Sequence, residues 1–229
     1  MSTIAANLQA IRRRISDALQ GDSRAVTLVA VSKLQPVEAL REAFDAGCRD
    51  FGENYVQDAL AKVAALAGMP ITWHFIGHLQ TNKARDVAEN FDWVHGVDRL
   101  KLAQALSKAR PPARGELNIC IQVNISAEQT KGGVAPGEAL GLARDIAAVP
   151  GLRLRGLMGM ASPTEDVTEQ RVQFARLRAA RDEIRAAGIE LDTLSMGMSQ
   201  DLEAAVAEGT TLVRIGTAIF GERRRKGSA

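Results

Sequence analysis

A lysine at the end of an apolar run is the first residue whose chemistry can be inferred from the sequence. The run Val26–Val31 is almost wholly apolar and rich in β-branched residues, which is typical of a strand buried on both faces, and Ser32 and Lys33 follow it directly. An amine partly withdrawn from water at a strand end favours its neutral form. A neutral amine can condense with a carbonyl compound to give a Schiff base. A lysine that simply extends from the strand end into solvent explains the same position.

Two glycine-containing segments late in the sequence could bind a phosphate group. Gly197 lies between Ser195 and Ser199, and Gly216 is followed by Thr217. Glycine lets backbone N–H groups approach an oxyanion closely, and the hydroxyl groups offer further donors. The same residues also suit two tight turns, with Ser199 as a helix N-cap. A Schiff-base lysine facing such a phosphate cup fits pyridoxal phosphate (PLP), and it fits a phosphosugar aldolase equally well.

Arg214 lies in an apolar run just before Gly216. A guanidinium in a buried position is costly unless it has a partner. Two partners remain open at this point: the ring nitrogen of a bound cofactor, or a buried carboxylate such as that of Glu53.

The segments that would position these residues alternate between strand-like and helix-like patterns, after an amphipathic helix that ends at Gly21. This alternation predicts βαβ units and a parallel sheet. Eight units in a chain of this length predict a (β/α)8 TIM barrel with an extra N-terminal helix, and a doubly wound open sheet is the alternative. The predicted strands are 26–31, 48–52, 71–77, 93–97, 117–125, 152–161, 193–196 and 211–215. The predicted helices between them are 36–44, 55–66, 82–90, 99–108, 136–148, 165–187 and 200–208.

In barrels of this class the functional residues gather at the carboxyl ends of the strands. Lys33, Asn54, Ser195 and Gly216 each lie at or just after the end of a predicted strand. We therefore expect these residues to meet at one face of the barrel.

The composition excludes several classes of protein. The 229 residues include 29 Lys and Arg against 27 Asp and Glu, so the net charge is only +2 and gives no nucleic-acid footprint. No run of apolar residues is long enough to span a membrane, and the first residues do not resemble a secretion signal. Two isolated cysteines, Cys48 and Cys120, predict buried thiols in a reducing compartment. We expect a cytoplasmic monomer with one domain over residues 1–222 and a disordered basic tail over 223–229.

A series of motifs runs along nearly the whole chain. They are Ala30-Val31-Ser32-Lys33, Phe51-Gly52-Glu53-Asn54-Tyr55, Trp73-His74-Phe75-Ile76-Gly77-His78, Gln122-Val123-Asn124-Ile125, Arg155-Gly156-Leu157-Met158, Leu194-Ser195-Met196-Gly197-Met198-Ser199 and Val213-Arg214-Ile215-Gly216-Thr217. These motifs resemble those of the YggS/PROSC family of pyridoxal phosphate homeostasis proteins, and they occur in the family's order, which makes the resemblance specific. Only Thr130-Lys131-Gly132-Gly133 departs slightly from the family's pattern.

The resemblance implies a barrel of the alanine racemase N-terminal-domain type with PLP as its cofactor. It implies that Lys33 carries the cofactor as a Schiff base, that Asn54 lies near its ring and that Arg214 faces the pyridine nitrogen. It also implies a phosphate cup made by Ser195, Gly197, Gly216 and Thr217.

The resemblance further implies a carrier that holds PLP for intracellular homeostasis, without robust turnover, and that supplies apo PLP-dependent enzymes. An amino-acid racemase on the same barrel is the alternative. Racemisation needs two bases on opposite faces of the substrate, and the chain has a single tyrosine, Tyr55. An arginine beside the ring nitrogen keeps that nitrogen unprotonated and the ring a weak electron sink. An aldolase would leave Arg214 unexplained.

Overall fold

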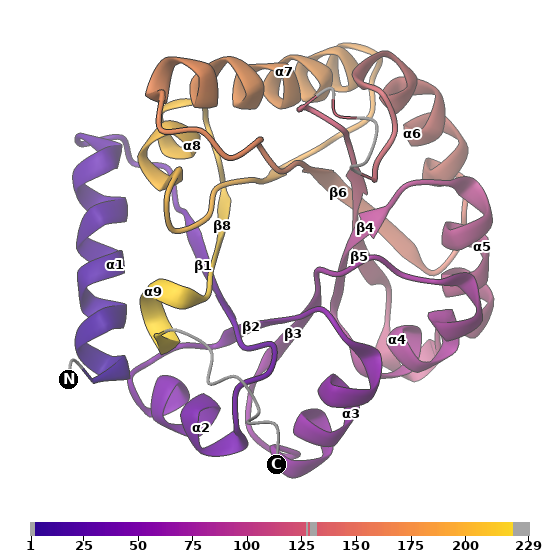
Figure 1. Cartoon of the computed structure of the whole chain (residues 1–229). Coiled ribbons are helices and arrows are strands. Elements are labelled where there is room, and N and C mark those ends of the chain that lie inside the picture. Colours follow the sequence, from indigo (N-terminus) through magenta and orange to yellow (C-terminus); the bar gives the residue numbers. More distant parts are fainter. Residues whose placement is uncertain (1–2, 127, 129–131, 222–229) are drawn as a thin grey trace.

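Eight parallel strands close into a barrel in the computed structural model of the chain (Figure 1). The structure describes residues 3–126, 128 and 132–221. Each strand pairs with the next in sequence, and β8 returns to pair with β1, as in Leu28 with Val213 and Ala30 with Ile215. The strands are β1 (Thr27–Val31), β2 (Asp50–Glu53), β3 (Thr72–Phe75), β4 (Trp93–Val97), β5 (Leu117–Gln122), β6 (Leu152–Met158), β7 (Thr193–Ser195) and β8 (Leu212–Ile215).

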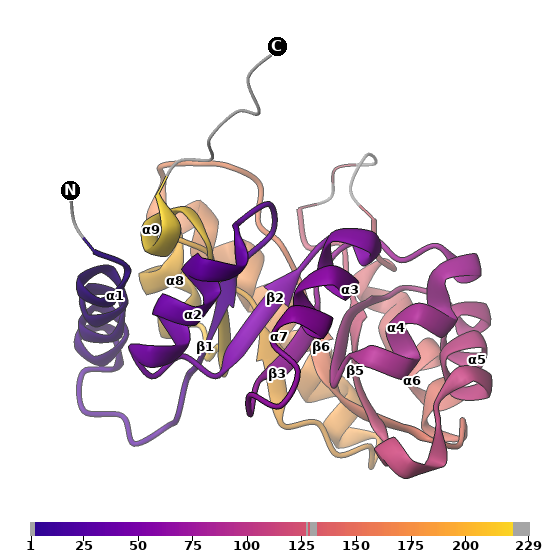
Figure 2. The ribbon, with the colours of Figure 1, turned by 90° about the horizontal axis from the view of Figure 1, so that it is seen from below.

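Helices surround this barrel, as the views along and across its axis show (Figures 1 and 2). They are α1 (Ile4–Leu19), α2 (Val37–Asp45), α3 (Val56–Ala65), α4 (Ala84–Asn90), α5 (Leu100–Ala109), α6 (Ala139–Ala147), α7 (Val167–Ala186), α8 (Leu202–Ala207) and α9 (Thr217–Phe220). Short 3-10 turns are η1 (Thr81–Lys83), η2 (Pro112–Arg114) and η3 (Pro136–Glu138).

The predicted (β/α)8 barrel with an extra N-terminal helix is confirmed, and the open sheet is excluded by the β1–β8 pairing. Several strands end earlier than their apolar runs. Strand β5 ends at Gln122, because the backbone beyond it pairs with Val134 of its own loop, although the side chains of Val123 and Ile125 are still buried.

The sequence did not predict α9. The predicted tail 223–229, and Thr130 and Lys131, lie outside the described residues. No helix in the described ranges is long and apolar enough to cross a membrane.

The outer faces of the strands form an apolar layer against the helices. Phe51 packs on Trp73 with ring centroids 6.0 Å apart, and Phe75 meets Phe91 edge to face at 5.5 Å. This layer holds most of the fully buried large side chains. Inside the ring of strands, by contrast, polar side chains take positions that branched apolar residues usually fill in such barrels.

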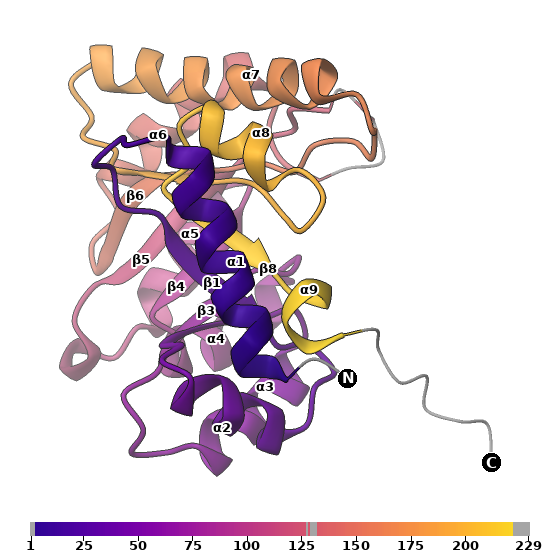
Figure 3. The same ribbon diagram turned by 90° about the vertical axis from the view of Figure 1, so that its left-hand side faces the viewer.

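Helix α1 is fixed across the side of the barrel, beside α8 and α9 (Figure 3). Thr3 caps its first turn, and Leu8 is among the residues that face the core. Asn7 donates a hydrogen bond to the Ile219 carbonyl (2.8 Å), and Arg14 donates to the Ser199 carbonyl (3.0 Å) and pairs with Glu203. The helix therefore contacts the segments that follow β7 and β8.

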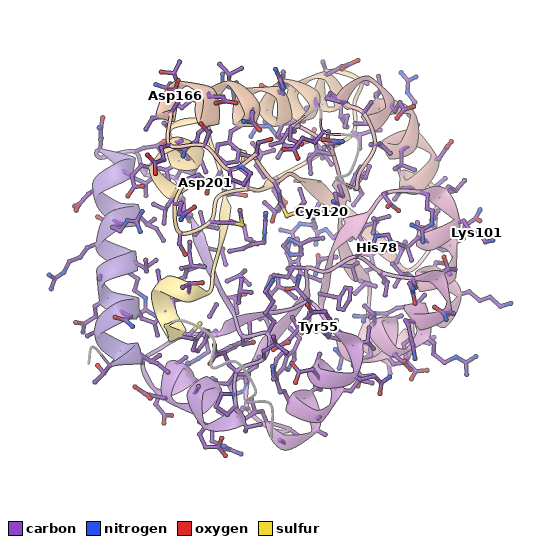
Figure 4. All side chains as sticks on the ribbon, viewed as in Figure 1. Tyr55, His78, Lys101, Cys120, Asp166 and Asp201 are labelled. Carbon is purple, nitrogen blue, oxygen red and sulfur yellow. The ribbon has the colours of Figure 1, made fainter. Side chains whose placement is uncertain are left out.

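Both cysteines are buried and neither forms a disulfide. Cys120 lies inside the ring of strands (Figure 4). Burial raises the pKa of Cys48 to about 11 and that of Cys120 to about 12. Because the thiolate is the nucleophile, we expect both thiols to react extremely slowly with an aromatic disulfide reagent in the folded protein and rapidly after denaturation. Absorbance of the released thiolate measures this, and fast labelling of the folded protein would contradict it.

Candidate functional site

A cavity of about 560 Å³ opens among the segments at the carboxyl ends of the strands. Its size is typical of a site for a small molecule. Figure 4 shows one of its residues, Asp201, at the start of α8. The cavity is lined by Val31, Lys33, Gln35, Asn54, Ile76, Met160, Ala161, Ser162, Pro163, Thr164, Gln170, Met198, Ser199, Gln200, Asp201, Arg214, Gly216, Thr217, Ala218 and Gly221.

Lys33 reaches this cavity from a tight turn at the end of β1. Ser32, just before it, is fully buried, and the turn is closed by a hydrogen bond from the Gln35 N–H to the Ser32 carbonyl (3.0 Å). Leu34 has a φ of 62°, a left-handed conformation that is uncommon for a bulky side chain. Lys33 itself is half-buried. The turn thus directs the lysine into the cavity rather than out into bulk solvent.

A largely buried ion cluster between α3 and the end of β2 stabilises this turn through the Ser32 carbonyl and the Leu34 N–H. The Lys62 ammonium donates to a Glu53 oxygen (2.8 Å), to Asp58 (2.7 Å) and to the Ser32 carbonyl (2.8 Å), which satisfies all three of its hydrogens. Asp58 also accepts from the Leu34 N–H. Burial raises the pKa of Glu53, although Lys62 and the Ser32 hydroxyl oppose the rise.

Arg214 enters the cavity from β8 and is nearly buried. Its guanidinium donates to the Ser195 hydroxyl (2.6 Å) and to the Gly159 carbonyl (3.1 Å). Desolvation lowers the pKa of Arg214 to about 10, while the charge of Asp201 opposes the shift, so the side chain stays cationic at neutral pH. Glu53 pairs with Lys62 instead, so the carboxylate alternative for Arg214 is not realised.

Gly216 and Thr217 line the cavity together with Ala218 and Ser199. Thr217 and Ala218 begin α9, and the first N–H groups of a helix have no partner within it. A Cβ at Gly216 would lie 3.2 Å from the Val31 carbonyl oxygen, so a larger residue would press on β1. These residues form one polar wall of the cavity.

Ser195 and Gly197 are not part of that wall. Ser195 is the last residue of β7 and is fully buried, and its hydroxyl is bound to His95 and Arg214 inside the barrel. Gly197 has a φ of 97° and lies against Ala205, where a Cβ would be 2.7 Å away. The positive φ and the close approach to Ala205 both favour glycine here, and a role for Gly197 in the phosphate cup stays a prediction.

Asn54 lines the cavity at the end of β2. Its side-chain oxygen is buried and has no hydrogen-bond partner among the described residues. A Cβ at Gly77 would overlap the Asn54 carbonyl oxygen, so the glycine permits the close approach of these two strand ends. A buried amide oxygen without a partner is costly, which indicates a position prepared for a ligand.

Two groups of residues were missed in the reasoning from sequence. The first group lines the cavity: Ser199 was considered as a hydroxyl donor but was not predicted as a site residue, and Asp201 was not considered at all. The polar residues Asp50, His74 and His95 lie inside the barrel. A signal for the histidines existed, because each interrupts a short strand of otherwise apolar character at a central position.

Comparisons with known proteins bear on this geometry. Residues 1–224 match the family model described as alanine racemase, N-terminal domain. The pyridoxal phosphate homeostasis protein of Pseudomonas aeruginosa is 54% identical over 226 residues, which cover 97% of each chain. The Escherichia coli K12 protein of the same name is 46% identical over 97% of this chain and 98% of its own. The chain belongs to the family of pyridoxal phosphate homeostasis proteins.

Solved structures agree with this family assignment. PipY of Synechococcus elongatus, solved with PLP bound, matches with a TM-score of 0.84 at 37% identity, over 96% of this chain and 100% of its own. An alanine racemase of Clostridium difficile matches with a TM-score of 0.77 over 96% of this chain and 58% of its own. Its identity is 14%, so this likeness shows the fold alone. The predicted family and the alanine racemase N-terminal-domain fold are confirmed.

The ion cluster below Lys33 leads to a pH-dependent prediction. Lys62→Met removes the cation beside Glu53, so the native-state pKa of this carboxyl rises further above its unfolded value. The proton bound in the native state then makes stability fall as pH rises between the two pKa values. We expect a loss of about 3 kcal/mol near neutral pH that shrinks toward about pH 5, measured by urea unfolding.

Lys101→Met is the control, because Lys101 is exposed on α5 (Figure 4). Its free energy of unfolding should change by at most about 0.5 kcal/mol at either pH. An equal loss for Lys62→Met at both pH values would refute the role given to Glu53.

Proposed function

We propose that this protein binds PLP as a Schiff base on Lys33 and acts in intracellular PLP homeostasis without robust catalytic turnover. The observation that carries the proposal is the convergence of Lys33, Arg214 and the Gly216–Thr217 wall on one cavity. The names of its relatives and the PLP bound in PipY support it.

The residues of the cavity fit this cofactor. The buried oxygen of Asn54 lacks a partner among the described residues, and the Arg214 cation lies where an acceptor such as a pyridine nitrogen could meet it. Gly216, Thr217 and Ser199 offer backbone and hydroxyl donors of the kind that bind a phosphate. When bound, PLP supplies an aldehyde that condenses reversibly with an amine.

Within this site the side chains divide the work. Lys33 holds the cofactor covalently, and Arg214 donates to the ring while keeping its own proton, since its pKa of about 10 is above the working pH. Asn54 contacts the ring, and the Gly216–Thr217 wall with Ser199 holds the phosphate. Ser195 stays a prediction for the phosphate cup, and its hydroxyl also accepts a hydrogen bond from Arg214. Gly197 shapes the turn beneath the cup.

A racemase is less well supported by the cavity. Tyr55, the tyrosine considered as a second base, is 53% exposed and is not among the lining residues (Figure 4). Asp201 is a carboxylate at the cavity, but it accepts a hydrogen bond from the Met198 N–H at the start of its own helix. These contacts favour a carrier over an enzyme that needs two opposed bases.

The proposal includes release of PLP to apo PLP-dependent enzymes by a cytoplasmic monomer that binds neither nucleic acid nor membrane. Exposed apolar side chains at the rim of the cavity support contact with another protein. Met160 and Met198 line the cavity and are 36% and 39% exposed, and Leu34 directly follows Lys33 and is 58% exposed. Exposed apolar side chains beside a cavity are typical of interaction surfaces.

The covalent link can be tested directly. We expect the protein with added PLP to show a near-visible absorption band, and borohydride reduction followed by peptide mapping to place a pyridoxyl group on Lys33. Lys33→Ala should lose the band and the adduct while retaining part of the affinity through the phosphate wall. Identical spectra for the wild type and Lys33→Ala would refute the assignment. Alanine racemisation, assayed on the same sample, separates carrier from enzyme.

Arg214→Gln removes the cation beside the ring but keeps a polar side chain. We expect PLP to dissociate about tenfold faster or more, because a charge-assisted hydrogen bond is lost. Dissociation is measured by transfer of PLP to an excess of an apo-enzyme. Arg13→Gln, on the exposed face of α1, is the control and should match the wild type. Equal rates for both variants would contradict a contact between Arg214 and the cofactor.

A further inference from the structure

A row of hydrogen-bonded polar side chains crosses the interior of the barrel from β2 to β8. The Asp50 carboxylate meets His74 Nε2 at 3.0 Å, and His74 Nδ1 meets His95 Nε2 at 3.0 Å. His95 Nδ1 meets the Ser195 hydroxyl at 2.8 Å, and this hydroxyl accepts from Arg214 at 2.6 Å. The row joins Asp50, at the first residue of β2, to the cavity at the other end of the strands.

The chemistry of its two ends gives the row a direction. A guanidinium only donates, so the Ser195 oxygen accepts from Arg214 and its own hydrogen points to His95 Nδ1. The proton of His95 is then on Nε2 and is donated to His74 Nδ1. The proton of His74 is likewise on Nε2 and is donated to Asp50, which as a carboxylate only accepts. Every hydrogen bond in the row therefore runs from Arg214 toward Asp50.

The reverse arrangement is disfavoured while His74 is neutral. If His95 carried its proton on Nδ1, His74 would have to donate from Nδ1, and its bare Nε2 would face the Asp50 carboxylate. A doubly protonated His74 or a protonated Asp50 carboxyl would be needed to resolve this conflict. His74 is 1% exposed and His95 0%, and desolvation together with the nearby Arg214 guanidinium lowers the pKa of His95 well below its usual value. Burial thus favours a neutral His95, as the directed row requires.

The ring of His74 is also held by packing. Trp93 stacks on it, with centroids 5.5 Å apart and planes 14° apart, and the Arg155 guanidinium lies over Trp93 at 4.8 Å. Near Arg214, the charge of Asp201 acts on the guanidinium as well. Asp50, by contrast, is 27% exposed, so the anionic end of the row touches solvent while its middle is dry.

We propose that Asp50, His74, His95 and Ser195 are positioning residues that orient the Arg214 guanidinium and stabilise its charge across the barrel. The consequence for PLP rests on the function proposed above: a carboxylate at the opposite end of the strands sets how Arg214 is presented to the cofactor. Apolar residues would fill the same interior at a lower desolvation cost, so the buried polar row requires such a role.

The first test uses the apo protein and nitrogen-15 NMR of the imidazole rings. We expect unprotonated Nδ1 and protonated Nε2 signals for both His74 and His95 at neutral pH. A protonated Nδ1 on His95 would overturn the proposal, because the row would then run in the opposite direction. This measurement needs neither a variant nor bound PLP.

The second test breaks the row at its far end. In Asp50→Asn the carboxamide can donate as well as accept, so the direction is no longer fixed. We expect mixed tautomers for both histidines, shifted Arg214 N–H signals, a shifted near-visible band of the PLP complex and a loss of PLP affinity of about fivefold or more. Ser195→Ala removes the hydroxyl that joins Arg214 to His95. It should produce the same band shift and leave His95 Nδ1 without its hydrogen-bond partner.

Asp92→Asn is the matched control, because Asp92 is a carboxylate just before β4, 35% exposed, that binds Arg114 and the Trp73 N–H. It should change none of these signals. Arg214 signals in the apo protein that are identical in Asp50→Asn and Asp92→Asn would refute the proposal. Absence of a Lys33 adduct in the wild type would instead refute the Schiff base of the proposed function, and the NMR signals would still decide on the row.

Discussion

A cation that stays charged inside a β-barrel is the constraint on which much of this structure depends. Arg214 is almost completely withdrawn from water, and no carboxylate among the described residues pairs with it directly. A guanidinium in this position needs acceptors from several strands at once. It donates to the Ser195 hydroxyl on β7 and to the Gly159 carbonyl just after β6. The Ser195 hydroxyl is joined in turn through the two imidazoles to the Asp50 carboxylate. Arg214 thus stands at one end of the polar row that crosses the interior of the barrel.

Another buried cation, Lys62, is compensated in the opposite manner. Lys62 contacts two carboxylates and a carbonyl directly, so its charge is neutralised within one hydrogen-bond length. The result is a rigid support for the turn of Lys33. Arg214 instead keeps its direct contacts neutral, so its positive charge remains effective at the cavity. A cation that supports a turn and a cation that lines the cavity thus have different surroundings.

Much of the fold could be predicted from the sequence because burial on both faces leaves continuous apolar runs, such as the one that ends before Lys33. The exact strand ends could not, because an apolar run records burial rather than pairing, as Val123 and Ile125 show. Five of the seven predicted site residues line the cavity: Lys33, Asn54, Arg214, Gly216 and Thr217.

The position of Ser195 shows the limit of such reasoning. Ser195 is the last residue of β7, and its hydroxyl is bound inside the barrel, whereas Ser199, four residues further on in the loop before α8, lines the cavity. Which of the two serines lines the cavity depends on the path of this loop, which the sequence does not specify. The row through His74 and His95 could not be predicted, since it joins strands whose register the sequence does not specify.

Helix α1 has a consequence for how the site is assembled over time. The helix precedes all eight strands, yet its partners Ile219 and Ser199 lie 212 and 185 positions later in the chain. Contacts of such high sequence separation form late, because the intervening chain must first be ordered. On a ribosome, α1 emerges long before β8 and α9, so its contacts with Ser199 and Ile219 form only after the last strand has been synthesised. Capture of a ligand at this face is therefore limited to chains whose barrel has closed, and a nascent or truncated barrel leaves the ligand in solution.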